Sequence, residues 1–168
     1  MSIFVAILSL ITAVLYDLKS RRIPNWLTFG LMIVGLSISV IAHGTSVLLE
    51  HTLAMLAAFL SFFIIYLCNG IGAGDVKLVT GLSALLGLPF IMVGIPLILI
   101  FGGIYSATIL IWHRGLRYIG RDIINGFFAS LWNKRMHQYM KYVKKNGIFI
   151  PYSIVIFIGS GVTLWIIY

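Results

Sequence analysis

The chain has 168 residues, 61% of them hydrophobic and only 10% charged, and its formal net charge is +8. Soluble domains carry about 25% charged and about 45–50% apolar residues, so this composition excludes an ordinary soluble domain. A bilayer accommodates such a chain, because each spanning helix needs roughly 20 mostly apolar residues. We therefore predict an all-α, polytopic membrane protein with one membrane-embedded domain over residues 1–168. We attribute the positive charge to the orientation of the chain in the membrane and to contact with anionic lipids, not to nucleic-acid binding.

Three apolar runs in the first half of the chain predict three membrane spans. The first covers residues 3–16 and ends at Asp17, and a short basic turn follows it. Pro24 closes this turn, and proline suits the first turn of a new helix because its missing N–H is not needed there. We predict the second span over residues 26–42 and the third over residues 52–68. The first run has no basic n-region and no small-residue cleavage site, so we expect a retained span.

The apolar stretch over residues 76–112 is too long for a single span. Gly87-Leu88-Pro89 interrupts it, which predicts a short fourth span over residues 76–88 and a fifth over residues 90–112. At about 1.5 Å per residue the fourth span reaches only about 20 Å, short of the ~30 Å hydrocarbon core. We therefore expect it to be a partial span or to lie in a thinned region of the bilayer.

Residues 113–147 combine apolar positions at three- and four-residue steps with intervening arginines, which is typical of a basic amphipathic helix at the membrane interface. A sixth span follows over residues 148–168. Of the 12 Lys and Arg residues, three follow the first span, Lys77 lies beside the glycine loop, and the other eight lie between spans five and six. With six crossings and the N-terminus outside, all of them fall on one side, which the positive-inside rule makes cytoplasmic.

Only four acidic residues occur in the chain, and two of them are predicted at the same membrane face. Asp17 ends the first span and Asp75 begins the fourth, and an ionised group near hydrocarbon is costly enough to indicate function. Two close carboxyl groups share one proton, so one can activate a water as general base while the other acts as general acid on a scissile carbonyl. This pairing predicts an aspartyl endopeptidase without a metal or other cofactor. Glu50 is predicted in a solvated loop, and Asp122 as a surface ion-pair partner of Arg121 or a substrate contact.

Glycines precede the second aspartate at close spacing. Gly72 and Gly74 flank Ala73 immediately before Asp75. Glycine adopts backbone conformations closed to other residues and lets another chain approach closely, so these positions suit an extended substrate beside the aspartate. A tight loop at the start of a helix explains the same spacing. The four histidines and the lone Cys68 show no metal-ligand spacing, so we expect no metal site.

Three stretches of the chain carry recognisable motifs. They are DLKSRRIPN over residues 17–25, GAGDVKL over residues 72–78 and the shorter IPY over residues 150–152. Together they resemble the type IV prepilin peptidases, a branch of the GxGD membrane aspartyl proteases. The resemblance implies that Asp17 and Asp75 are the catalytic pair. The remaining motif positions are candidate substrate-binding or loop residues: Pro24, Asn25, Gly72, Gly74 and Lys77.

The resemblance also implies a substrate and a location. Members of this family cut the short basic leader from prepilins and pseudopilins at the cytoplasmic side, just before the hydrophobic helix that builds the filament. It therefore implies a multi-pass protein of the cytoplasmic membrane whose active site faces the cytoplasm. Larger members have an N-terminal segment with zinc-binding cysteine pairs and also methylate the new N-terminus. Because this chain has one cysteine, we expect a peptidase without methyltransferase activity.

The branch of the family and two other functions stay open. The chain resembles the peptidase-only branch that serves Flp-type (tight-adherence) pili as well as the archaeal preflagellin and prepilin peptidases, and we favour the bacterial branch. A transporter or membrane-complex subunit could instead use Asp17 and Asp75 as ion- or proton-relay carboxylates, although relay acids usually lie near mid-membrane. A signal-peptide-peptidase-like protease is the third candidate. Tyr16-Asp17 resembles its first motif, but its Pro-Ala-Leu motif is missing.

Overall fold

The computed structural model describes residues 1–67, 70–114 and 152–167, and every regular element in these ranges is a helix. The prediction of an all-α protein is therefore confirmed. Apart from its first two residues, the predicted amphipathic helix over residues 113–147 lies outside the described residues.

The chain divides into two compact units, one of residues Met1–Gly102 with Pro151–Tyr168 and the other of residues Gly103–Ile150. Of the second unit, the structure describes only the C-terminal part of one helix, α5 (Ile95–Arg114). All contacts discussed below belong to the first unit. The prediction of a single domain over residues 1–168 stays a prediction.

The first two helices are α1 (Ser2–Ser20) and α2 (Asn25–His43), joined by the basic turn. Helix α1 ends where Arg21 adopts the left-handed conformation with φ 53°, and the Arg21 N–H donates to the carbonyl of Asp17 at 2.8 Å. Asp17 therefore lies inside the last turn of α1, not beyond the end of the helix. Pro24 is the residue immediately before α2, and its φ of −67° fits this position.

A single 3₁₀ turn, η1 (Thr45–Val47), leads into α3 (Leu48–Leu67). The prediction that Glu50 lies in a loop is wrong, because Glu50 occupies the first turn of α3 and is half-buried. A carboxylate is stabilised at that position by the partial positive charge of the helix N-terminus. The prediction failed because the polar residues just before residue 52 belong to the first turn of α3 and not to the preceding loop.

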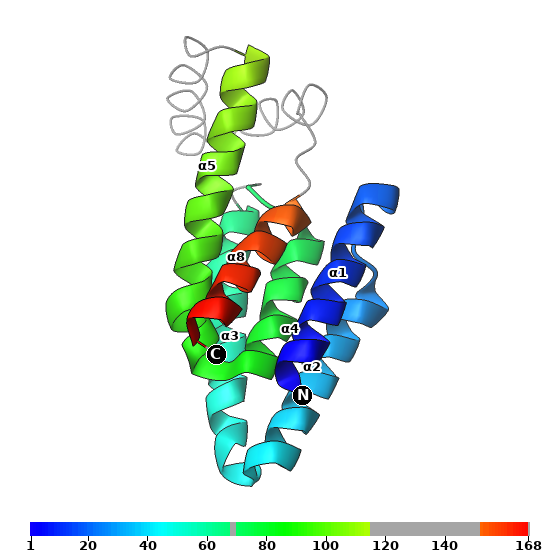
Figure 1. Ribbon diagram of the computed structural model, residues 1–168, viewed down its shortest axis with the longest axis vertical. Coiled ribbons are helices and arrows are strands. Elements are labelled where there is room, and N and C mark those ends of the chain that lie inside the picture. The colour runs from blue at the N-terminus through cyan, green and yellow to red at the C-terminus, as the bar shows by residue number, and fades with distance from the viewer. Residues whose placement is uncertain (68–69, 115–151, 168) are drawn as a thin grey trace. The chain divides into compact units, whose positions relative to one another are not determined.

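Helix α4 (Ala73–Pro89) is followed by a π-helical turn, η2 (Phe90–Gly94), and by α5. Gly87 interrupts the helical path with φ 71° and ψ −159°, a conformation that favours glycine. The chain reverses direction here, so that α4 and α5 form two separate helices, as Figure 1 shows. The break predicted at Gly87-Leu88-Pro89 is confirmed.

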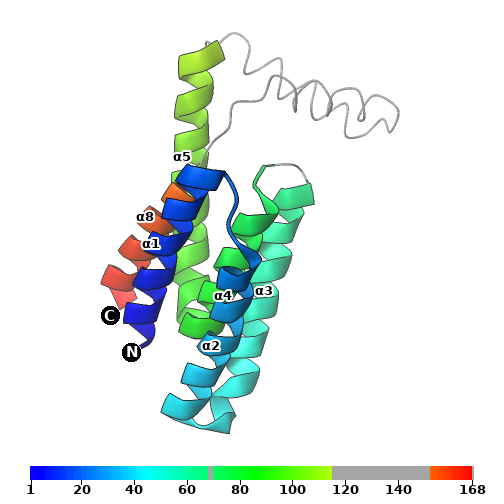
Figure 2. The ribbon, with the colours of Figure 1, turned by 90° about the vertical axis from the view of Figure 1, so that its right-hand side faces the viewer.

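Helix α4 forms the centre of the bundle, because nearly every residue from Asp75 to Gly87 is buried. Helices α2 and α3 pack along it, whereas α1 packs chiefly against the last helix, α8 (Tyr152–Ile167). The C-terminal end of α1 and the N-terminal ends of α4 and α8 lie at the same end of the bundle (Figures 1 and 2). The two aspartates are carried by α1 and α4 at this end.

Within the described residues, four stretches are long and apolar enough to cross a membrane: Ser2–Ser20, Asn25–His43, Thr45–Leu67 and Ala73–Thr108. The break at Gly87 divides the last of these into two helices, and α8 is shorter at 16 residues. The predicted number of six crossings therefore stays a prediction.

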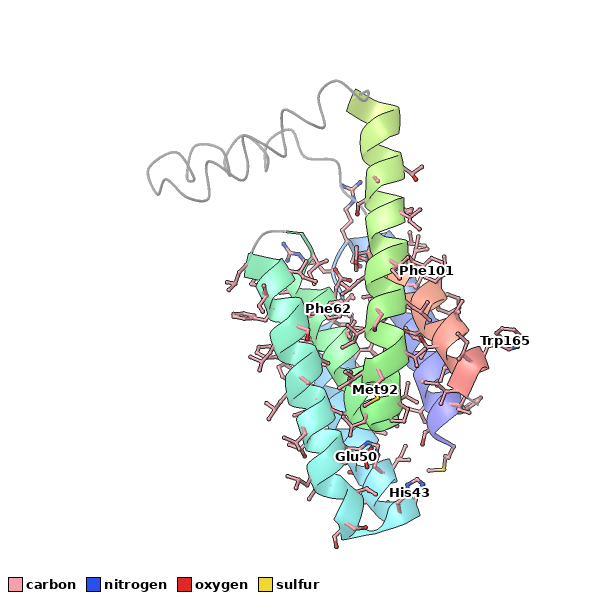
Figure 3. The ribbon with its side chains drawn as sticks, turned by 90° about the vertical axis from the view of Figure 1, so that its left-hand side faces the viewer. His43, Glu50, Phe62, Met92, Phe101 and Trp165 are labelled. Atoms are coloured by element: carbon pink, nitrogen blue, oxygen red, sulfur yellow. The ribbon has the colours of Figure 1, made fainter. Side chains whose placement is uncertain are left out.

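Large apolar side chains cover the outside of the bundle as well as filling its interior. Phe62 lies among the helices with no exposed surface, whereas Trp165 is 85% exposed and projects away from α8 (Figure 3). Met92 in η2 is also strongly exposed. A surface this rich in large apolar groups is unfavourable in water and favourable against lipid, so the chain is a membrane protein.

Candidate active site

Asp17 reaches the bundle interior because it lies on the buried face of α1. Ala6, Leu10 and Ala13 precede it at steps of three and four residues, and all are buried. Residues with this spacing share one face of a helix. Asp17 is only 6% exposed, so a carboxyl group occupies the last position of an otherwise apolar stripe.

Asp75 is held by the first turn of α4. Its Oδ2 accepts a hydrogen bond from the backbone N–H of Gly72 at 3.2 Å, which satisfies one of the unpaired donors of the helix start. Its other oxygen, Oδ1, is buried and has no hydrogen-bond partner among the residues that the structure describes. Buried polar atoms are normally paired, so this unpaired carboxyl oxygen is an exception in the bundle.

The two carboxyl groups lie close enough to interact electrostatically. Both are buried, and each is within one turn of the helix end that points to the same end of the bundle (Figure 2). The fold therefore brings together the two aspartates that the sequence analysis paired. The Tyr152 hydroxyl group at the start of α8 also interacts electrostatically with Asp75. It belongs to the IPY stretch.

Another side chain, which the sequence analysis missed, also belongs to this cluster. Ser153 of α8 donates a hydrogen bond from Oγ to Oδ2 of Asp17 at 2.6 Å, and the two residues are 136 positions apart in the sequence. Ser153 has no exposed surface. The one sequence signal for it is its place directly after the IPY stretch.

Lys77 and Asn25 contact each other and not the aspartates. The Lys77 Nζ donates to Oδ1 of Asn25 at 2.9 Å and lies 5.1 Å from the centre of the Phe29 ring. Two motif residues that are far apart in the sequence thus join the start of α4 to the start of α2. Pro24, the third predicted residue of this region, positions Asn25 by preceding α2.

The two motif glycines are close to side chains and do not need unusual backbone angles. Positive φ values among the described glycines occur only at Gly44 and Gly87, so Gly72 and Gly74 adopt backbone angles that other residues also adopt. A Cβ on Gly72 would lie 3.0 Å from Oδ2 of Asp75, and one on Gly74 would lie 3.1 Å from Ile23. Glycine is favoured at Gly72 because it leaves room for the carboxyl group.

The described histidine, cysteine, aspartate and glutamate side chains form no group of three or more that could hold a metal ion. The predicted absence of a metal site stays a prediction.

A helical bundle with membrane-length helices and two buried, interacting carboxyl groups at one end defines an integral membrane protein with a candidate acid–base site. Residues 4–110 match the profile of the type IV leader peptidase family, and the match covers more than half of the chain. The chain belongs to this family, and the family resemblance stated from the motifs is confirmed.

Two curated relatives are preflagellin peptidases. The one from Methanocaldococcus jannaschii is 34% identical over 86 residues, which make up 49% of this chain and 36% of the relative. The one from Methanococcus voltae is 33% identical over 85 residues, again 49% of this chain and 36% of the relative. The matched segment thus spans little more than a third of either protein. No solved structure matches the chain. The preference for the bacterial pilus branch stays a prediction.

Proposed function

We propose that the chain is an aspartyl endopeptidase of the GxGD type that removes the leader peptide of prepilin-like or preflagellin-like membrane proteins. The observation that carries this proposal is the meeting of Asp17 and Asp75, from two different helices, as buried and interacting carboxyl groups. Family membership supports the hydrolytic reaction and argues against the ion-relay alternative.

The chemistry follows from two carboxyl groups that share one proton. The ionised carboxylate takes a proton from a water molecule, whose oxygen forms a bond to the carbonyl carbon of the substrate. The protonated carboxyl group gives its proton to the carbonyl oxygen, so that a neutral tetrahedral diol forms. When the diol collapses, the amide nitrogen takes up a proton and the C–N bond breaks. No covalent enzyme intermediate is needed.

The substrate is a membrane-anchored protein with a short basic leader followed by an apolar segment. Residues Gly72–Gly74 are at least partly exposed and directly precede Asp75, so a peptide backbone can approach the aspartate from there. The names of the two relatives support a filament-subunit precursor as the class of substrate. We place the cleavage site at the cytoplasmic face of the cell membrane, because three basic residues lie at the aspartate end of α1: Lys19 in its last turn, and Arg21 and Arg22 just after it.

The proposal is tested by co-expressing the full chain with a prepilin or a preflagellin and following leader removal as a size shift on a gel. Asp17→Asn and Asp75→Asn keep the side-chain shape and remove the acid. We expect each to lower the initial cleavage rate by at least about 100-fold, because general acid–base groups typically contribute that much. Glu50→Gln is the matched control, since Glu50 lies at the other end of the bundle (Figure 3).

Two results would contradict the proposal. A normal cleavage rate in either Asn variant, at equal membrane levels, means that this aspartate is not catalytic. Failure of the unmodified chain to cut either substrate would favour the relay or subunit function. Equal losses in the Glu50→Gln control would show that any lost carboxylate harms the protein, and that the Asn variants do not report on the pair.

A further inference from the structure

Ser153 differs from most other buried hydroxyl groups of the bundle in where its proton goes. Ser83 and Thr163, for example, donate to carbonyl oxygens one turn earlier in their own helices. Ser153 instead donates across helices, from the first turn of α8 to Oδ2 of Asp17 in α1. A fully buried hydroxyl group is unfavourable unless it is paired, so this hydrogen bond fixes both side chains.

The length of this hydrogen bond is compatible with an ionised acceptor. An O–H···O⁻ bond to an ionised carboxylate is about 2.5–2.7 Å long, shorter than a bond between neutral groups. The Ser153–Asp17 distance of 2.6 Å falls in that range. The geometry therefore fits an ionised Asp17 whose Oδ2 is occupied by the serine and whose other oxygen is left to act on water.

Asp75 has the complementary arrangement. Its Oδ2 receives only the longer, 3.2 Å bond from Gly72, and its Oδ1 is buried without a partner among the described residues. An ionised oxygen in this position lacks the donors that would stabilise its charge. A protonated Oδ1 suits it better, because the O–H can donate to the carbonyl oxygen of an incoming peptide.

We propose that Ser153 is a positioning residue that divides the roles of the two aspartates, with Asp17 as the general base and Asp75 as the general acid. This inference rests on the proposed function. In the first step Asp17 takes a proton from water while the water oxygen bonds to the carbonyl carbon and Asp75 protonates the carbonyl oxygen. In the second step Asp17 gives its proton to the amide nitrogen, the C–N bond breaks, and a diol hydroxyl returns its proton to Asp75.

The test compares variants of the full chain purified in detergent, with kcat and KM measured for a precursor substrate and normalised to folded enzyme. Ser153→Ala removes the donor, and Ser153→Cys keeps a similar shape with only a weak donor. We expect kcat to fall about 10- to 100-fold in both, with little change in KM, because a hydrogen bond to a charged group is lost. Ser160→Ala is the matched control, since Ser160 lies on the same helix and its buried hydroxyl lacks a partner within the described part of the chain.

The outcomes separate this inference from a purely structural role. If Ser153 only stabilises the packing of α8 against α1, the variants lose thermal stability but their folded fraction keeps a normal kcat. That result overturns the proposal. A rise in KM at constant kcat overturns it too. If Ser153→Ala does not accumulate, the Ser153→Cys variant decides alone. The Asp17→Asn and Asp75→Asn variants identify the other failure: if they still cut, the catalytic pair itself is wrong.

Discussion

At the scale of single residues, Lys77 shows how a motif residue can support the site without contacting either aspartate. It follows Asp75 by two residues, which places the two side chains about 200° apart around α4. Asp75 therefore points toward Asp17, while Lys77 points toward the start of α2, where it contacts Asn25 and Phe29. These contacts fix the first turn of α4, and that turn carries the aspartate.

Lys77→Met should weaken this junction while keeping the apolar stem of the side chain. We expect the loss of one hydrogen bond to lower the free energy of unfolding by about 0.5–1.5 kcal/mol. Asn25→Ala should have a similar effect, and the double variant should lose no more than the larger single one. Thermal unfolding in detergent measures this, with Lys19→Met, an exposed lysine near the end of α1, as the control. Fully additive losses would show that the two residues act separately.

The aspartates and Ser153 differ in how well the sequence alone could predict them as site residues. Asp17 and Asp75 were predictable, because a carboxyl group beside hydrocarbon is costly and only four acidic residues exist. Ser153 was not, because serines and threonines in apolar helices usually bond to their own backbone, as Ser9 and Thr12 do here. Whether a particular serine meets a carboxylate depends on how α8 packs against α1, which no local pattern records.

At the scale of helices, Gly35 lets the backbone of α2 approach that of α4 closely. A Cβ placed on Gly35 would lie 2.9 Å from the backbone nitrogen of Leu85, so the two helix backbones are nearly in contact there. Small residues permit such approaches between membrane helices. Gly30, five residues earlier in α2, has no heavy atom within 4 Å of its own Cβ position. Two glycines in one helix thus have opposite environments.

Gly35→Ala should therefore push α2 away from α4, whereas Gly30→Ala should leave the packing unchanged. Because backbone atoms cannot move aside as a side chain can, we expect Gly35→Ala to destabilise the protein by about 1–3 kcal/mol. Thermal unfolding of the two variants in detergent, together with the cleavage rate, measures the difference. Equal behaviour of the two variants would mean that α2 and α4 are not in backbone contact at this point.

Two helix boundaries differed in how well the sequence predicted them. The break between α4 and α5 was predictable, because Gly87 and Pro89 act on their own backbone. The end of α1 was predicted too early, since Lys19 and Ser20 read as a loop but continue the helix. Polar residues end the apolar stretch of a membrane span, but they do not end the helix. The helix ends only where Arg21 adopts the left-handed conformation.

At the scale of the whole molecule, the orientation in the membrane is the property that the proposed function depends on most. Ser20, the last residue of α1, and Ser46, in η1, are both exposed and lie on either side of α2 in the sequence. That helix has 19 residues, so at about 1.5 Å per residue its ends are roughly 28 Å apart, close to the thickness of the hydrocarbon core. The two serines should therefore face opposite sides of the membrane.

Cysteine labelling of intact cells tests this orientation. In a Cys68→Ser background, which removes the one native cysteine, Ser46→Cys should react with a membrane-impermeant maleimide from outside. Ser20→Cys should react only after the membrane is opened, because the basic turn beside it is held at the cytoplasmic side. The reverse pattern would place Asp17 and Asp75 at the outer face, where a leader peptide that stays in the cytoplasm cannot reach them. Reaction of both from outside would mean that α2 does not cross the bilayer, and the six-span arrangement would fail with it.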